Sequence, residues 1–453
     1  MVVKYDAAGP RAACPNLSRP ALVTLLCLIF ILPYNRYLWL STFWNAQKVL
    51  AIPMMWFVLL GLLGGTLNIP KRVLGPILLL GILKVASLSV LLMQGAQIEA
   101  GWILTWAQTV PLMICVACLI VSFRDLTSLY KIVIVQNLTS GVAFLALYLS
   151  FRQLWDRLGY SLVEIPRMGG GYGYRNTLAG LLGYGGSSAY SFQLAMTMPL
   201  LLCGLQQSLQ GRWRKWWRLA AAGSVGIGLC NTLLTFQRVG YILVFVQMFV
   251  VVFKGRKISL KKVAVTLICV GLAGVLVVGV GAAGAALERV DAVWGALSAG
   301  REDRSVAGRL NIIGAAVNRI AESPLWGFGP GKSGEVGRIA FGYYNTVENG
   351  VVSMAYESGL PYAVSYCVWV FYVLWWKWNG GKEKQPLFFG VFLAVLSGFV
   401  YGQTQTFETS VWWAVLLGAL LSRGVGAADP ASGSTRRHRL RLVQSRLIAV
   451  PAA

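Results

Sequence analysis

Long apolar segments recur along the whole chain, and they constrain its fold more than any other feature. Hydrophobic residues make up 57% of the 453 residues and charged residues only 12%, whereas a soluble domain carries about 25% charged residues. A helix of about 20 apolar residues crosses the hydrocarbon core of a bilayer. We therefore predict an all-α polytopic membrane protein, with residues 1–453 forming a single integral membrane domain. About twelve spans are expected, at 20–38, 49–68, 73–93, 102–122, 130–150, 188–207, 218–235, 239–253, 261–284, 361–378, 386–402 and 408–423.

The net charge of +24 does not indicate nucleic-acid binding, because the basic residues fall in alternate loops. These loops are 71–72, 124–131, 212–218, 254–262 and 377–384, followed by the basic tail 424–453. Cytoplasmic loops carry an excess of Lys and Arg, so we expect both termini and the tail in the cytoplasm, with the basic residues against anionic membrane lipids. The polar segments 34–48, 151–187 and 285–360 then lie on the outer face of the membrane.

Cys115 and Cys118 have the spacing of a redox or metal motif. They lie within a predicted span and have no partner pair, so we interpret them as ordinary buried cysteines and predict no metal site.

The outer loop 151–187 divides into two parts. Residues 151–162 alternate apolar and charged side chains at helical spacing, which suits a helix lying in the headgroup plane. A glycine-rich stretch with Arg167 and Arg175 follows. It is either a flexible loop or a phosphate-binding segment, because guanidinium groups bind phosphate in a directional, bidentate way.

Two cations stand in apolar surroundings. Arg238 lies between two apolar runs, and a charge near bilayer depth usually faces a cavity or a partner. It either occupies a short outer turn with its side chain extended to the interface, or faces an outward-opening cavity. Lys84 lies in the third span, where we expect a paired carboxylate or an interfacial location.

The large outer loop 285–360 contains two expected helices. Residues 308–320 have an apolar stripe of Leu310, Ile313, Ala316, Val317 and Ile320, and Ser323-Pro324 ends it before a glycine-rich turn. A second, short helix follows Glu348 and Asn349 and ends at Ser358-Gly359.

The residues around this short helix have structural interpretations of their own. Asn349 could cap the helix, and Glu348 would gain from the helix dipole. Pro361 suits the first turn of the next span. Glu357 is expected to be a solvated or helix-supporting acid.

Taken in order, these segments resemble the O-antigen ligase and polymerase family of bacterial envelopes. The matching features are the helix from Arg309 to Ile320, the turn from Pro324 to Gly331, the pair Glu348-Asn349, and the segment from Tyr356 to Leu360. The junction Gln237-Arg238-Val239-Gly240 and the stretch from Arg167 to Asn176 resemble two further family motifs. Together the likeness covers roughly residues 160–362, while the first five spans match only in hydropathy.

The resemblance implies a glycosyltransferase of the bacterial inner membrane. Such an enzyme transfers a glycan from a polyprenyl diphosphate to an acceptor hydroxyl on the outer face, without a cofactor or metal. Arg167, Arg175, Arg238 and Arg309 would bind the diphosphate, and Arg238 would stabilise its developing charge. Asn349 and Gln237 would orient the acceptor. Implied partners are the lipid-linked glycan, membrane lipids, and polysaccharide export or chain-length-control proteins.

The chain departs from the family at one position. Family members carry a His-Asn pair, but the only histidine here is His438, in the basic tail, and Glu348 stands in its place. Glu348 would then act as the general base or only orient the acceptor. A polysaccharide polymerase is favoured. An O-antigen-type ligase, a transporter or flippase, and a non-catalytic member of an export complex are the alternatives.

Overall fold

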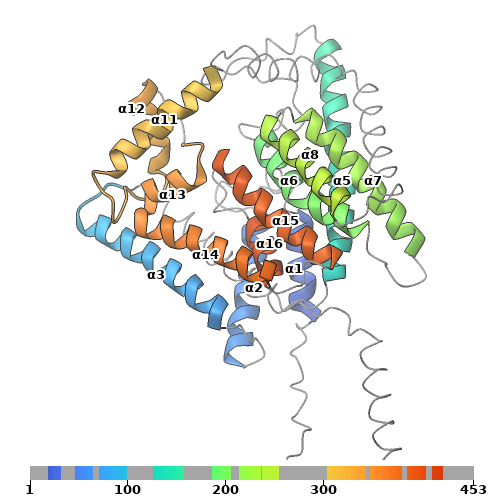
Figure 1. Cartoon of the computed structure of the whole chain (residues 1–453), viewed down its shortest axis with the longest axis horizontal. Coiled ribbons are helices and arrows are strands. Elements are labelled where there is room, and N and C mark those ends of the chain that lie inside the picture. Colours follow the sequence, from blue (N-terminus) through green and yellow to red (C-terminus); the bar gives the residue numbers. More distant parts are fainter. Residues whose placement is uncertain are drawn as a thin grey trace, which may run out of the picture.

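The computed structural model describes residues 19–31, 46–64, 71–98, 126–157, 186–205, 214–235, 237–254, 304–342, 347–379, 385–404 and 411–421 (Figure 1). Within these ranges the fold consists of helices and turns without a strand, which confirms the all-α prediction. The helices are α1 (Arg19–Ile31), α2 (Ala46–Leu63), α3 (Lys71–Met93), α5 (Leu126–Arg157), α6 (Gly186–Gly204), α7 (Arg214–Leu234), α8 (Arg238–Phe253), α11 (Arg304–Ile320), η3 (Lys332–Glu335), α12 (Val336–Phe341), α13 (Gly350–Ser358), α14 (Leu360–Asn379), α15 (Pro386–Tyr401), η5 (Gly402–Thr404) and α16 (Val411–Leu421).

The apolar runs that predict spans coincide with helices wherever the structure describes them. The predicted spans 102–122 and 261–284 lie outside the described residues. Three described helical segments are long and apolar enough to cross a membrane: Leu74–Met93, Leu126–Ala146 and Pro386–Thr404. The chain is therefore a helical membrane protein, and the total of about twelve spans stays a prediction.

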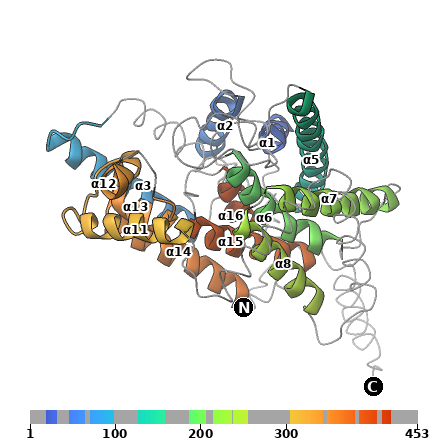
Figure 2. The same cartoon turned by 90° about the horizontal axis from the view of Figure 1, so that it is seen from above.

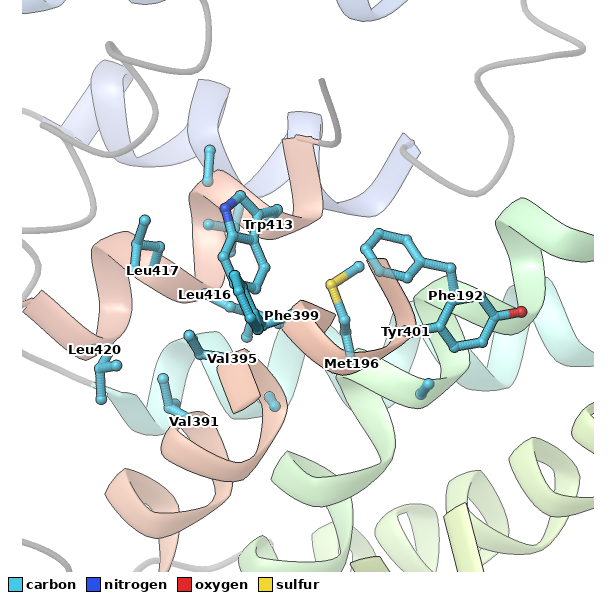
Figure 3. Close-up of a cluster of buried hydrophobic side chains, with 14 of the residues drawn as sticks. Phe192, Met196, Val391, Val395, Phe399, Tyr401, Trp413, Leu416, Leu417 and Leu420 are labelled. Atoms are coloured by element: carbon cyan, nitrogen blue, oxygen red, sulfur yellow. The ribbon is translucent and has the colours of Figure 1, made fainter. Parts of the chain in front are cut away.

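The centre of the fold is the close packing of α6 against α15. A Cβ atom on Gly390 would lie 2.9 Å from the carbonyl oxygen of Pro199, so the two helix backbones meet at this point. Figure 3 shows the apolar cluster beside this contact, where Trp413 of α16 packs with Met196 and Phe399. Small residues let membrane helices approach closely and gain dispersion contacts.

Polar side chains join α5, α6 and α7 inside the bundle. Asn137 donates to the carbonyl oxygen of Ser224 at 2.8 Å and to its hydroxyl at 3.0 Å. Asn231 donates to the Tyr190 hydroxyl at 3.0 Å. Because the bilayer core offers no water, such interhelical hydrogen bonds hold buried polar groups that would otherwise stay unpaired.

Helix α5 differs from the prediction. Residues 151–162 were expected to form a separate helix in the headgroup plane, but residues 151–157 continue α5, which has 32 residues, and residues 158–162 lie outside the described ranges. At about 1.5 Å per residue such a helix is longer than the hydrocarbon core is thick. Its C-terminal end therefore extends past the predicted span at residue 150, and the sequence pattern of charged and apolar residues fits this extension equally well.

The helices between residues 304 and 358 gather on one side of the molecule. In Figures 1 and 2, α11, α12 and α13 lie together with α3, whereas α5, α7 and α8 lie on the other side. The short helix η5, at the end of α15, contacts α13. These helices are thus attached both to α3 and to the central helix pair.

Candidate functional site

Helix α11 supplies the first wall of the site. Its buried side chains are Ile312, Ala316 and Ile320, at the i, i+4, i+8 spacing of one helix face. The helix confirms the prediction for 308–320, but the predicted stripe was wrong in part. Leu310 and Val317 are 62% and 50% exposed, because the face that packs is rotated toward Ile312. This rotation brings Arg309 to the side of α11 that faces α13.

The turn after α11 is built from glycines in the left-handed region. Gly327, Gly329 and Gly331 have φ angles of 70°, 97° and 79°, a conformation that side chains with a Cβ atom rarely adopt. Space is also lacking, because a Cβ on Gly327 would lie 2.6 Å from the carbonyl oxygen of Tyr356. The predicted glycine-rich turn is confirmed, and its glycines serve a close approach of backbone to backbone.

This turn holds the C-terminal end of α13. The Phe328 and Gly329 amides donate to the carbonyl oxygens of Tyr356 and Glu357 at 2.8 and 3.0 Å. In return, the Leu360 amide donates to the Pro324 carbonyl oxygen at 2.8 Å. We call residues 321–331 the clamp turn, since these bonds join it to the last turn of α13 and the first residue of α14.

Asn349 caps the other end of α13. Its Oδ1 atom accepts a hydrogen bond from the Val352 amide at 3.0 Å, and its backbone is extended, as expected for a residue that precedes a helix. The predicted cap is confirmed. Pro361 occupies the first turn of α14, as the sequence predicted, where its missing amide proton costs nothing.

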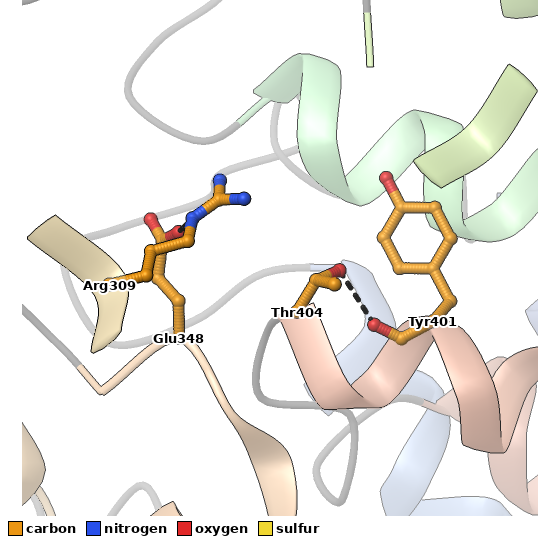
Figure 4. A network of polar contacts seen from close by, with 4 residues as sticks. All are labelled: Arg309, Glu348, Tyr401 and Thr404. Atoms are coloured by element: carbon orange, nitrogen blue, oxygen red, sulfur yellow. Dashed lines mark hydrogen bonds and ion pairs between the residues drawn. The ribbon is translucent and has the colours of Figure 1, made fainter. Parts of the chain in front are cut away.

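Arg309 and Glu348 meet between α11 and α13, although they are 39 residues apart in the chain. The Arg309 Nε atom donates to Glu348 Oε2 at 2.5 Å, and the two side chains are 40% and 37% exposed. In Figure 4 the terminal guanidinium nitrogens turn away from Glu348, toward the side on which Thr404 and Tyr401 lie. A guanidinium in this position can bind an anion while its Nε atom holds the carboxylate.

The Gln237-Arg238 junction is a short turn between helices. Helix α7 ends at Leu234 and α8 begins at Arg238, with Gln237 in an extended conformation before it. A helix N-terminus presents free amide groups that favour anions. The first turn of α8 packs on α6, because a Cβ on Gly240 would lie 2.2 Å from the Ser191 hydroxyl.

Helix α6 connects this junction with the end of α15. Phe192, the residue after Ser191, packs edge-on against Tyr401 with ring centroids 5.3 Å apart. Tyr401 immediately precedes η5, which contacts α13. The start of α8 and the Arg309–Glu348 pair are therefore joined through α6 and the end of α15.

Glu357 was expected to be a solvated or helix-supporting acid, but it is half-buried and its carboxylate binds Ser333 of η3. Its Oε1 atom accepts hydrogen bonds from the Ser333 hydroxyl at 2.6 Å and the Ser333 amide at 3.4 Å. Burial raises the pKa of Glu357, while the Ser333 bonds and the positive charge of Lys84 act in the opposite direction. The expected carboxylate partner of Lys84 is thus Glu357, and the lysine within an apolar span was the signal for it.

The remaining predicted residues are not brought into the site by the described structure. Arg167 and Arg175 lie outside the described residues, and for Arg238 only the backbone position is described. Of the predicted site residues, the structure brings Arg309, Glu348 and Asn349 together and places Gln237 at the start of α8. Lys84 and Ser333 were not predicted as site residues, because their partners are distant in the sequence.

Comparison with known protein families gives a match that includes most of this site. Residues 222–367 match the family model described as O-antigen ligase. The match contains Gln237, Arg238, Arg309, Glu348 and Asn349, whereas Arg167 and Arg175 precede it. No curated protein matches the chain.

Proposed function

Because residues 222–367 are a domain of the O-antigen ligase family, we propose that the chain is a membrane glycosyltransferase that uses a polyprenyl-diphosphate-linked glycan. The observation that carries the proposal is the Arg309–Glu348 pair. It joins α11 and α13, two of the helices in the matched residues that carry family-like motifs. An exposed ion pair contributes only about 0–1 kcal/mol to stability, so stability alone gives little reason for these two charges.

The two side chains have complementary roles in the proposed reaction. The acceptor hydroxyl gives its proton to Glu348, and its oxygen forms a bond with the anomeric carbon of the donor sugar. The bond between that carbon and the diphosphate oxygen breaks, and the polyprenyl diphosphate leaves with the electron pair. Arg309 and Arg238, with Arg167 and Arg175, bind the diphosphate and stabilise its charge as it leaves.

Positive charge for this reaction comes from arginines, so the reaction needs no metal ion. The leaving group is already activated, which also removes the need for a nucleotide sugar. Asn349 and Gln237 orient the acceptor. The site faces the outer side of the bacterial inner membrane, with both termini in the cytoplasm.

Polymerisation of a surface polysaccharide is the favoured activity. The position of the family histidine holds Glu348 here, and the absence of that histidine is the reason to favour a polymerase over a ligase.

The proposal is tested with Arg309→Ala, Glu348→Gln and Arg238→Ala in cells whose own copy of the gene is deleted. We expect loss of long glycan chains at a normal level of membrane-inserted protein, because each variant removes charge from the reacting groups. Glu335→Gln is the matched control. Glu335 is also a partly exposed carboxylate of the outer segment, paired with Lys332 at 2.7 Å.

The accumulated products distinguish the alternatives. Single repeat units on the lipid support a polymerase, and long unattached polymer supports a ligase instead. Unchanged glycan in all three variants contradicts the transferase assignment and leaves a transporter or a non-catalytic component. If only Glu348→Gln keeps full activity, Glu348 is not the general base, and the transferase assignment stands.

A further inference from the structure

One face of α3 contacts the clamp turn and the end of α13. Lys84, Ser87 and Leu91 are spaced by three and four residues, so they lie on the same side of the helix, and all three are buried. Ile82, Val85 and Leu92 are 65%, 55% and 49% exposed, which places the lipid-facing surface elsewhere on α3. This buried face lies outside the matched residues 222–367.

Lys84 joins α3 to the end of α13 and the start of α14. Its side chain is 6% exposed, and its ammonium group lies 4.8 Å from the ring centroid of Tyr362. Its charge interacts with that of Glu357. A buried cation is costly, and the Glu357 carboxylate and the Tyr362 ring offset part of that cost.

Ser87 and Ile98 join α3 and its outer turn to the clamp turn. The Ser87 hydroxyl donates to the Trp326 carbonyl oxygen at 2.5 Å. Gly329 of the clamp turn lies so close to Ile98 that a Cβ atom on Gly329 would be 2.9 Å from Ile98 Cδ1. Polar and apolar contacts therefore fix the clamp turn on α3 at several successive points.

We propose that Lys84 and Ser87 are positioning residues of the transferase site. They hold the C-terminal end of α13, directly and through the clamp turn. Helix α13 has nine residues, so a displacement at one end is passed to the other, where Asn349 caps the helix and Glu348 reaches Arg309. This inference rests on the proposed function of the Arg309–Glu348 pair.

The test uses membrane vesicles with the full-length protein. The donor is the lipid-linked repeat unit extracted from cells that lack the gene. Lys84→Met removes the charge and keeps most of the side-chain length, Lys84→Arg keeps the charge, and Lys84→Glu/Glu357→Lys exchanges the two charges. We expect Lys84→Met to lower kcat about tenfold or more with KM for the donor unchanged, since small misplacements of reacting groups are costly.

Lys377→Met is the matched control. Lys377 is likewise 6% exposed and lies 4.6 Å from the ring centroid of Trp376, but it contacts Leu421 of α16 rather than the clamp turn. We expect its kcat to equal that of the wild type. We further expect Lys84→Arg to keep most of the activity. The exchanged pair should be more active than either single charge reversal, Lys84→Glu or Glu357→Lys.

Two results would overturn the proposal. One is a Lys84→Met protein as active per molecule as Lys377→Met, and the other is an exchanged pair no better than Lys84→Glu alone. If Lys84→Met does not reach the membrane, the exchanged pair decides, with rates normalised to protein amount. Failure of the proposed function is seen separately, as full activity of Arg309→Ala and Glu348→Gln.

Discussion

Adjacent residues at the start of α13 have different partners. Glu348 pairs with Arg309 of α11, whereas the side chain of Asn349 turns back to the amide of its own helix. The two belong to one family-like motif, in which the resemblance implies an acceptor-orienting role for Asn349 and a general-base or orienting role for Glu348. The geometry assigns Asn349 a structural contribution that is separable from any contact with the acceptor.

Replacing Asn349 separates these contributions. Asn349→Ala is expected to lower the free energy of unfolding by about 1 kcal/mol through loss of the cap. Asn349→Ser should lower it much less, because serine also caps helices. Thermal unfolding in detergent measures both. The acceptor-orienting role further predicts that Asn349→Ser loses glycan synthesis at normal stability. Full synthesis by Asn349→Ser would mean that capping is the whole contribution of Asn349.

At the scale of elements, the clamp turn and α13 form one unit because their backbones touch. Gly359 ends α13 with a φ of 84°, and a Cβ atom there would lie 2.1 Å from the Leu325 carbonyl oxygen. A side chain at this position would have to separate the turn from the helix and break the hydrogen bond from Leu360 to Pro324.

Gly359→Ala is therefore expected to be strongly destabilising. The backbone of Gly359, with φ 84° and ψ 162°, lies in a region essentially restricted to glycine and costs about 1–3 kcal/mol with a Cβ atom, and the steric overlap adds roughly 1–3 kcal/mol. Gly342→Ala reports only the cost of a positive φ, because Gly342 has a φ of 76° and a ψ of 0° but no atom within 4 Å of its Cβ position. Thermal unfolding in detergent should show a much larger loss of stability for Gly359→Ala than for Gly342→Ala. Equal losses would contradict the close contact between the clamp turn and α13.

The elements of this region were largely predictable, and their contacts were not. Helical periodicity located α11, and the Asn349 and Pro361 signals located the starts of α13 and α14. The packed face of α11 was misplaced, because Leu310 and Ile312 are equally apolar and only tertiary packing decides between them. The partners of Arg309 and Lys84 are 39 and 273 residues away along the chain, and no local pattern reports such pairings.

At the scale of the whole molecule, the polar segment that contains α11, α12 and α13 is held between two groups of helices. Helix α3 contacts it on one side and η5 reaches it from the central helices. The distribution of basic loops predicts that this segment faces the outside of the cell and that the start of α7 faces the cytoplasm.

Membrane orientation is testable by labelling single cysteines in a cysteine-free variant. Glu322→Cys in the clamp turn, where the native side chain is 60% exposed, should react in intact cells with a maleimide that does not cross membranes. Lys215→Cys, at an exposed position of α7, should react only after permeabilisation. The reverse pattern would place the transferase site on the cytoplasmic face and contradict the proposed orientation.

The docking of α3 on the clamp turn has a consequence for how such proteins diverge and how they can be recombined. Because Lys84 and Ser87 precede the matched residues 222–367, a chimera that receives these residues from a relative would contain a clamp turn without the α3 helix that fits it. Such exchanges should succeed when α3 travels with the domain. Among relatives, a change of charge at the position of Lys84 should be accompanied by a compensating change at the position of Glu357.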